Sequence, residues 1–354
     1  MVSRVERTAL IAATVLMLHH AARPPEAFAR NPTPYHPQMI ERHLVTIGGG
    51  RRLNLVCIGE GSPTVVFMQG GEGNVLNWRM IEKPIAAMTQ ACFYDRAGFG
   101  YSDPPAGPVT AVSETDDLHA LLRKVGIARP VVLVGHSIGG FYATMYADRF
   151  LGEVAGLVLV DSGFAGQMHE RTPEQRKIAM ENSHRGEERE LGCAALAKQG
   201  KVSMNTPECI RFPPPGSPAE AAYVSYMTTH PYWYEAEVSQ SRNFFWGADG
   251  GSSLDTLQER AVRRSFGDIP IIAMSSDQMG REAWQDDASF QDFVQHWRAG
   301  QAQLAARSTR GKSFVVPGSD HFIQRTRPDV VISAIQGVIG DVRHSPLDPP
   351  ADRP

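Results

Sequence analysis

The chain has 354 residues, of which 42% are hydrophobic and 21% charged, so it can bury a large core as one domain or as a core with an insertion. Its formal net charge is only −3, and no local cluster of basic residues stands out. The charge therefore argues against a nucleic-acid or anionic-lipid partner.

The N-terminal segment predicts a signal peptide over residues 1–29, followed by an extension over 30–42. Two arginines precede an apolar run from Ala9 to Leu18, and the small residues at 27–29 suit a signal peptidase. The run is shorter than the ~20 residues that cross a bilayer, so no stable membrane anchor is expected. We therefore predict a secreted or periplasmic protein, with an unprocessed N-terminus as the alternative.

Residues 43–161 alternate between strand-like and helix-like segments. A hairpin of two strands is predicted over 43–49 and 51–59, where apolar residues flank glycines. Periodicity then predicts strands within 64–68, from residue 91, at 131–135 and at 156–161, with helices at 78–90, 112–125 and 140–150. This alternation predicts parallel strands that are connected by helical crossovers.

Residues 162–266 have a different composition, with charged, proline-bearing and aromatic stretches in place of apolar strands, and predict an insertion. The alternation resumes with strands at 269–277 and 313–317 and helices at 281–306 and 328–339. The predicted fold class is therefore α/β, with a core over 43–161 and 267–342. Residues 343–354 have the composition of a disordered tail.

Four cysteines suit two disulfide bonds in an oxidising compartment. Cys193 and Cys209 bracket a polar stretch and would close a short loop, whereas Cys57 and Cys92 lie on predicted strands. Spacing alone leaves the pairing open, and buried free thiols are the alternative.

The stretch Gly-His-Ser-Ile-Gly at 135–139 matches the G-x-S-x-G pattern of a nucleophile elbow. It lies between a predicted strand and a predicted helix, where a sharp turn would hold the Ser137 hydroxyl clear of the chain. Gly135 and Gly139 have no side chains, which leaves room for the strand and the helix to come close together. A structural Gly-Ser turn is the alternative interpretation.

A serine hydroxyl needs a neighbouring base to become a nucleophile. His321 follows the last predicted strand and should therefore lie at the same sheet edge as Ser137. Asp277, at the end of the preceding strand, is the preferred orienting acid because it gives the chain order Ser, Asp, His. Asp161, which ends another strand, is the main rival, and Asp320 is a weaker one.

Two backbone N–H groups are expected to stabilise the negative charge on an attacked carbonyl, each contributing about 3 kcal/mol. One belongs to Ile138, and the other is assigned to Gly71, with Gly70 as the next choice, in the glycine-rich loop after the strand at 64–68. A phosphate-binding loop is the alternative, but Leu76 replaces its third glycine and a Walker lysine is missing.

Together these motifs resemble the α/β-hydrolase fold superfamily, in particular its capped serine hydrolases and esterases. The resemblance covers roughly residues 43–340 and is carried by TVVFMQGGEGNVLNW, YDRAGFGYSD, LVGHSIGG, LVLVDS and SDHF. It implies a mostly parallel eight-stranded sheet with helices on both faces, a cap formed by 162–266, and catalysis by Ser137, Asp277 and His321 without a cofactor or metal.

The chain departs from the family pattern at two places. Gln69 stands where many relatives have a histidine, so a different hydrogen bond is expected to support the oxyanion loop. Asp277 lacks the preceding glycine that relatives commonly have. The family's strand order would also place the strands of Cys57 and Cys92 side by side, which makes a disulfide between them geometrically reasonable.

The predicted function is a serine hydrolase that cleaves a carboxylic ester through an acyl-enzyme. An apolar small-molecule ester is the expected substrate, because the insertion contains Trp233, Phe245 and four neighbouring aromatic residues; packing of the cap is the equal alternative for these side chains. Peptidase, thioesterase, lactonase or acyltransferase activity remains open, as does a non-catalytic binding protein on the same fold.

Overall fold

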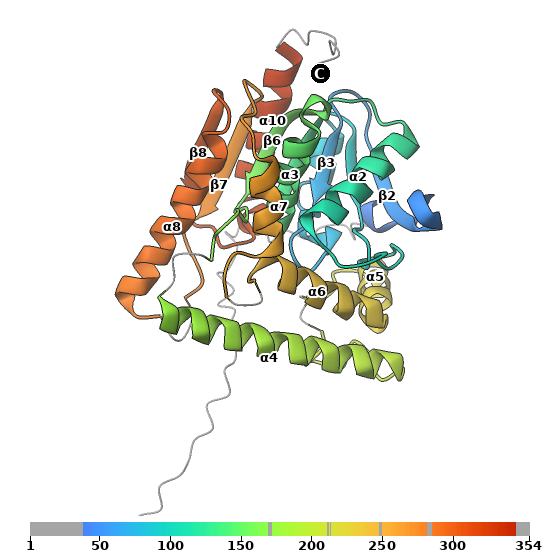
Figure 1. Ribbon diagram of the computed structural model, residues 1–354. Helices are drawn as coiled ribbons and strands as arrows, with labels where there is room; N and C mark the ends of the chain where they lie inside the picture. The colour runs from blue at the N-terminus through green and yellow to red at the C-terminus, as the bar shows by residue number, and fades with distance from the viewer. Residues whose placement is uncertain are drawn as a thin grey trace, which may run out of the picture. The chain divides into compact units, whose positions relative to one another are not determined.

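A sheet of eight strands, counted over the part of the chain that the structure describes, forms the centre of the computed structural model (Figure 1). The described residues are 38–168, 172–210, 212, 214–247, 250–281 and 285–344. The predicted signal peptide and the tail beyond His344 lie outside them. Among the described residues, no helix combines the length and the apolar character that a membrane crossing requires.

The strand order is β1-β2-β4-β3-β5-β6-β7-β8, and every pair from β4 to β8 is parallel, whereas β1 and β2 pair antiparallel. The predicted mostly parallel eight-stranded sheet is thus confirmed. The strands are β1 (Leu44–Thr46), β2 (Arg52–Ile58), β3 (Val65–Met68), β4 (Ala91–Tyr94), β5 (Val131–His136), β6 (Val154–Val160), β7 (Ile271–Ser276) and β8 (Gly311–Val316).

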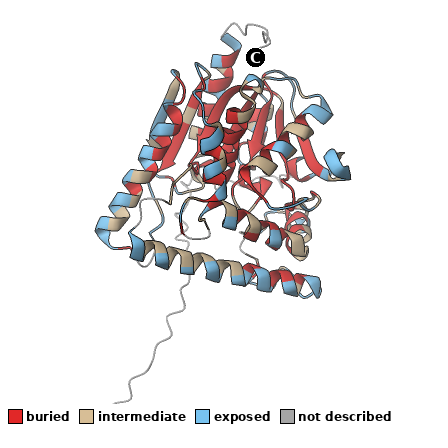
Figure 2. Ribbon diagram, in the orientation of Figure 1, coloured by how far each residue is buried: buried red, intermediate tan, exposed pale blue. Residues whose placement is uncertain are grey.

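The inner strands are buried on both faces, which explains their continuous Val/Leu/Ile runs. Alternate residues of one strand contribute to two hydrophobic clusters, one on each side of the sheet: Val66 packs in the first and Val65 in the second. Figure 2 shows these strands as the buried centre of the structure.

Helices cover both faces. The first cluster contains side chains of α2 (Ala111–Val125), α3 (Ile138–Arg149) and α8 (Asp287–Ala305), and the second contains side chains of α1 (Glu82–Ala86) and α10 (Pro328–His344). The remaining short helices are η2 (Gln38–Ile40), η3 (Gly48–Gly50), η4 (Val75–Trp78), η5 (Leu151–Glu153) and α9 (Ile323–Thr326).

The helix expected over 78–90 is the clearest difference from the sequence prediction. The structure forms only η4 and the five-residue α1 there. Pro84 lacks an N–H and fits only the first turn of a helix, while the Thr89 hydroxyl already donates to the Pro63 carbonyl oxygen (2.6 Å) and directs the chain into β4. The helix is therefore limited at both ends.

The insertion between β6 and β7 is helical and consists of α4 (Pro173–Lys198), α5 (Pro218–Thr229), α6 (Pro231–Phe244) and α7 (Leu254–Val262). The long helix α4 packs along α6, as Figure 1 shows at the lower edge of the view. Side chains of Thr172, Ser217 and Ser253 cap the N-termini of α4, α5 and α7, and the first two of these helices begin with proline.

Both disulfide bonds are present. Cys57 and Cys92 face each other in the antiparallel register of β2 and β4 and are bonded (S–S 2.07 Å), as the resemblance implied. Cys193, near the end of α4, is bonded to Cys209 (S–S 2.00 Å), which closes a short loop inside the insertion.

Candidate active site

Ser137 lies on the tight turn from β5 into α3 and has φ 53° and ψ −127°, a conformation that L-residues rarely adopt. Gly135 and Gly139, two residues before and after Ser137, lie where a side chain would clash with the backbone. A Cβ added to Gly135 would lie 2.5 Å from the Gly139 carbonyl oxygen, and one added to Gly139 would lie 2.3 Å from the carbonyl oxygens of Gln69 and Met68. The sequence motif therefore corresponds to a strained, closely packed elbow.

Asp161 ends the neighbouring strand β6 and is the other described non-glycine residue with positive φ (44°). Its carboxylate is 1% exposed and accepts hydrogen bonds from the Ser276 backbone N–H (3.0 Å), the Ser276 hydroxyl (3.0 Å) and the Trp297 indole N–H (2.8 Å). A fourth comes from His321 Nδ1 (2.7 Å). These donors fix the carboxylate in one orientation.

His321 and Asp161 favour each other's charged forms. Burial in itself lowers the pKa of His321, but the hydrogen bond and negative charge of Asp161 outweigh burial and raise it above its usual value. Burial likewise raises the pKa of Asp161, but the hydrogen bond and charge of His321, with the donors from Ser276 and Trp297, lower it overall. The imidazole is thus a stronger base than an isolated histidine.

The prediction that Asp277 orients His321 is corrected by this geometry. The Asp277 carboxylate instead accepts hydrogen bonds from the backbone N–H groups of Gly318 (2.8 Å) and Ser319 (3.0 Å), and so braces the loop that carries His321. Asp161 instead contacts the imidazole, and its carboxylate also accepts from Ser276, the last residue of β7. Asp320 bonds locally to the Phe322 N–H (2.8 Å).

The structure brings Ser137, His321 and Asp161 to one edge of the sheet. The Ser137 N–H donates to the carbonyl oxygen of Val160, the residue before Asp161 (3.1 Å). His136, the residue before Ser137, donates from Nε2 to the His321 carbonyl oxygen (2.8 Å), and the two imidazole rings lie 4.7 Å apart. Ser137, Asp161 and His321 are therefore joined through one backbone hydrogen bond and one hydrogen bond from a side chain to the backbone.

His136 is itself buried, which is the main reason why its pKa falls to about 3, with repulsion from a charged His321 adding to the effect. It is neutral at physiological pH and serves as a fixed support for the base.

The glycine-rich loop predicted to supply an oxyanion donor lies against the elbow. A Cβ added to Gly70 would be 2.8 Å from His136 Nδ1 and 3.4 Å from Ser137 Cβ, so a side chain has no room there. The Gly71 N–H makes no hydrogen bond to another described residue, and Ile138 begins α3, where an N–H has no partner within the helix. Gln69 donates to the Tyr94 carbonyl oxygen beneath the loop.

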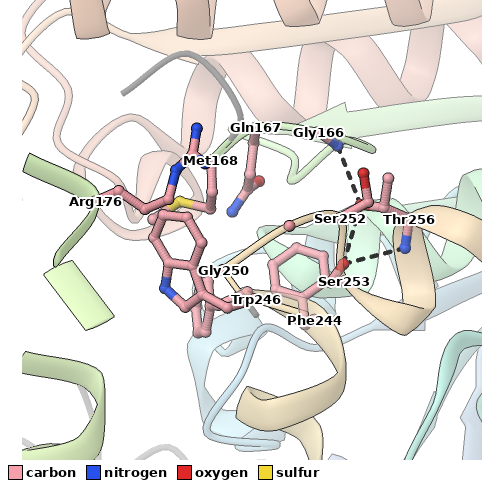
Figure 3. A pocket seen from close by; sticks show the side chains of 12 residues that line it. Gly166, Gln167, Met168, Arg176, Phe244, Trp246, Gly250, Ser252, Ser253 and Thr256 are labelled. Carbon is pink, nitrogen blue, oxygen red and sulfur yellow. Dashed lines mark hydrogen bonds between the residues drawn. The ribbon is translucent and has the colours of Figure 1, made fainter. Parts of the chain in front are cut away.

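The two predicted substrate-contacting aromatics occupy different environments. Phe245 lines a small pocket together with Phe244, Trp246 and Met168, and Figure 3 labels the last three. Trp233 is only 1% exposed, packs against Phe212 and lies in the hydrophobic cluster of the insertion. The position of Trp233 corresponds to the packing alternative, because a buried ring presents no surface to a ligand.

Sequence reasoning also missed the side chains that hold the acid in place. Trp297 was expected on the buried face of a helix, but its indole N–H donor to Asp161 could not be assigned from helical spacing. Ser276 was part of the segment that pointed to Asp277, yet it binds Asp161.

A protein-family model described as the alpha/beta hydrolase family matches residues 65–334. An uncharacterised protein of Schizosaccharomyces pombe is 31% identical over 140 residues, which are 32% of this chain and 26% of that protein. The chain therefore spans about a quarter of the length of this curated relative.

Solved structures with similar folds include the epoxide hydrolase CorEH (TM-score 0.59, 17% identity, 86% of this chain and 99% of that chain). A thermophilic esterase from Thermogutta terrifontis is also similar (TM-score 0.53, 19% identity, 85% of this chain and 99% of that chain). At these identities the likeness shows the fold alone. Because the family model covers well over half of its length, the chain belongs to the alpha/beta hydrolase family.

Proposed function

We propose that this protein is a serine hydrolase that cleaves a carboxylic ester. The observation that carries the proposal is the 2.7 Å hydrogen bond from His321 to buried Asp161, directly beside the strained turn of Ser137. A serine, an imidazole and a carboxylate in this order form the arrangement that acyl-transfer enzymes use on unrelated folds.

In the proposed mechanism, His321 Nε2 takes the proton of Ser137 as the hydroxyl oxygen attacks the ester carbonyl carbon. The N–H groups of Gly71 and Ile138 stabilise the developing oxyanion. His321 then protonates the leaving alcohol, which leaves an acyl group on Ser137. A water molecule, deprotonated by His321, attacks the acyl carbon, and His321 returns the proton to the Ser137 oxygen as the carboxylic acid leaves. Asp161 holds the imidazole tautomer and stabilises its charged form throughout.

The Phe244 ring lies against Gly163, two residues after Asp161, and lines a pocket with Phe245 and Trp246, which supports an apolar acyl or alcohol group in the substrate. Two disulfide bonds support an oxidising location, secreted or periplasmic, for the folded protein. An aspartate nucleophile, as epoxide-opening chemistry on this fold would need, is not supported, because position 137 is serine.

The test is hydrolysis of p-nitrophenyl esters from acetate to octanoate. We expect wild-type turnover, a loss of about 10⁴-fold or more in kcat for Ser137→Ala, and retained turnover for the control Ser162→Ala. Ser162 lies two residues after the adjacent strand β6, and its hydroxyl donates to the Gly163 carbonyl oxygen (2.8 Å) and makes no hydrogen bond to Ser137 or His321 in the described part of the chain. A wild-type protein without turnover of any ester, or equal rates for wild type and Ser137→Ala, would favour a non-catalytic binding protein.

A further inference from the structure

A fully buried arginine holds the oxyanion loop from behind. Arg96 follows β4 in the sequence, and its side chain is 0% exposed. Its guanidinium donates to the carbonyl oxygens of Gly70 (2.9 Å) and Gly71 (3.1 Å). Burying a guanidinium is costly unless its donors are paired; both terminal nitrogens of Arg96 have acceptors, whereas its Nε has none among the described residues.

The carbonyl contacts determine where the amide groups of the loop point. In a planar trans peptide, the C=O of one residue and the N–H of the next point in opposite directions. Because Arg96 binds the carbonyl oxygens of Gly70 and Gly71, the N–H groups of Gly71 and Glu72 face away from Arg96. The positive charge at the carbonyl end also polarises each peptide and strengthens its N–H as a donor.

The second contribution to this arrangement comes from the insertion. Gln240, on α6, is 4% exposed and accepts a hydrogen bond from Arg96 Nη1 through Oε1 (2.6 Å). Its Nε2 donates to the Gly71 carbonyl oxygen (3.1 Å). About two turns earlier on α6, the Trp233 indole N–H donates to the Glu72 carbonyl oxygen (3.4 Å). Three successive carbonyl groups of the loop are therefore held, two of them by α6.

The arginine has no freedom to leave this position. Its Nη1 lies 3.7 Å from the buried carboxylate of Glu114 on α2, and its guanidinium carbon lies 4.5 Å from the ring centre of Phe99. These contacts fix the charge between the core and the insertion. Gln69, which replaces the histidine of many relatives, does not contact the loop carbonyls that Arg96 binds.

We propose that Arg96 and Gln240 are positioning residues for the oxyanion hole, so that helix α6 of the insertion completes the active site as well as covering it. This inference rests on the proposed hydrolase function. Its consequence is that loosening α6 at Gln240 lowers the rate of the chemical step, because a misplaced N–H loses most of its stabilisation of the transition state.

The test compares Gln240→Leu with Asn243→Ala on the same helix. Asn243 donates to the Val109 carbonyl oxygen (2.9 Å) and so joins α6 to the core without contacting the loop. We expect Gln240→Leu to lower kcat for p-nitrophenyl butyrate about 10- to 100-fold with KM changed less than about twofold. Affinity for phenylboronic acid, which forms a tetrahedral adduct on the serine, should fall by a similar factor. Asn243→Ala should retain both values.

A third variant separates positioning from folding. Gln240→Glu keeps an acceptor for Arg96 but loses the donor to Gly71, so we expect its melting temperature to stay near that of wild type while the loss in kcat persists. Unchanged kcat and boronate affinity in Gln240→Leu, or equal losses in Asn243→Ala, would overturn the inference. Fluorophosphonate labelling of wild-type Ser137 is measured in parallel: labelled wild type with a neutral Gln240→Leu refutes only this inference, whereas unlabelled wild type refutes the hydrolase as well.

Discussion

The opposite pKa shifts of His321 and Asp161 have consequences for stability. The pKa of His321 is raised above its usual 6.5 on folding, so its contribution is complete below that pH and is lost as pH rises through the folded value. The pKa of Asp161 is lowered below its usual 3.8, so its contribution is complete above that pH and is lost as pH falls through the folded value. The pair therefore stabilises the fold most between about pH 4 and pH 6.5.

At the residue scale, the identity of the acid is directly testable. Asp161→Asn removes the carboxylate that accepts from His321 Nδ1, so we expect kcat to fall about 10⁴-fold. Asp277→Asn, the matched control, loses only contacts to the backbone N–H groups of Gly318 and Ser319. We expect it to lower stability while kcat changes less than about tenfold.

The pH profile of kcat/KM distinguishes the same two variants in a second way. The base must be neutral to accept a proton, so wild-type activity should rise with pH through a midpoint above 6.5, the usual pKa of histidine. Asp161→Asn removes the hydrogen bond to a charged acceptor and the negative charge that most raise the pKa of His321, which moves the midpoint to lower pH. A larger loss or shift in Asp277→Asn would restore Asp277 as the orienting acid.

At the element scale, the turn from β5 to α3 depends on the absence of side chains. The chain at Gly135 approaches the backbone of Gly139 and Gly140 so closely that an added Cβ would lie within 2.5 Å of both. Backbone atoms cannot move aside as the end of a flexible side chain can, so the strand and the helix would have to separate.

We therefore expect Gly135→Ala to lower the free energy of unfolding by about 2 kcal/mol or more and to reduce turnover. Gly337→Ala is the control, because Gly337 lies inside the exposed face of α10 with no atom within 4 Å of an added Cβ. Helix propensity predicts that this change stabilises the protein by about 0.5–1 kcal/mol. Urea unfolding measures both values, and equal stability of the two variants would contradict the packing argument.

The elements that the sequence predicted best are those whose signal is local. A continuous apolar run followed by glycines is enough to predict β5 and the elbow of Ser137, and the strand end before His321 places that residue at the same edge. The choice between Asp161 and Asp277 was not local. It depends on the positive φ of Asp161 and on donors from Trp297, more than 130 residues further along the chain.

Local sequence patterns also failed to predict the long-range contacts of the insertion. Composition predicted that residues 162–266 leave the alternating pattern, but it could not show that Gln240 reaches the oxyanion loop or that Trp233 is buried. Both depend on how α6 packs against the core, which is a tertiary contact without a sequence period.

At the scale of the whole molecule, two consecutive core residues after β4 each contact a different helix of the insertion. Tyr223, on α5, donates to Asp95 (2.7 Å), and the next residue, Arg96, binds Gln240 on α6. The Cys193–Cys209 disulfide stiffens the insertion itself, and a closed loop of this length contributes about 3 kcal/mol in the chain-entropy account. These contacts and the disulfide hold the insertion against the core, as the proposed role of α6 requires.

The most direct measurement of the central claim is the mass of the intact protein, and of its peptides, after reaction with a fluorophosphonate. The account predicts one phosphonyl group per molecule on Ser137, no adduct in Ser137→Ala, and labelling that is slower by orders of magnitude in His321→Ala. An unlabelled wild-type protein, or an adduct on a residue other than Ser137, would contradict it.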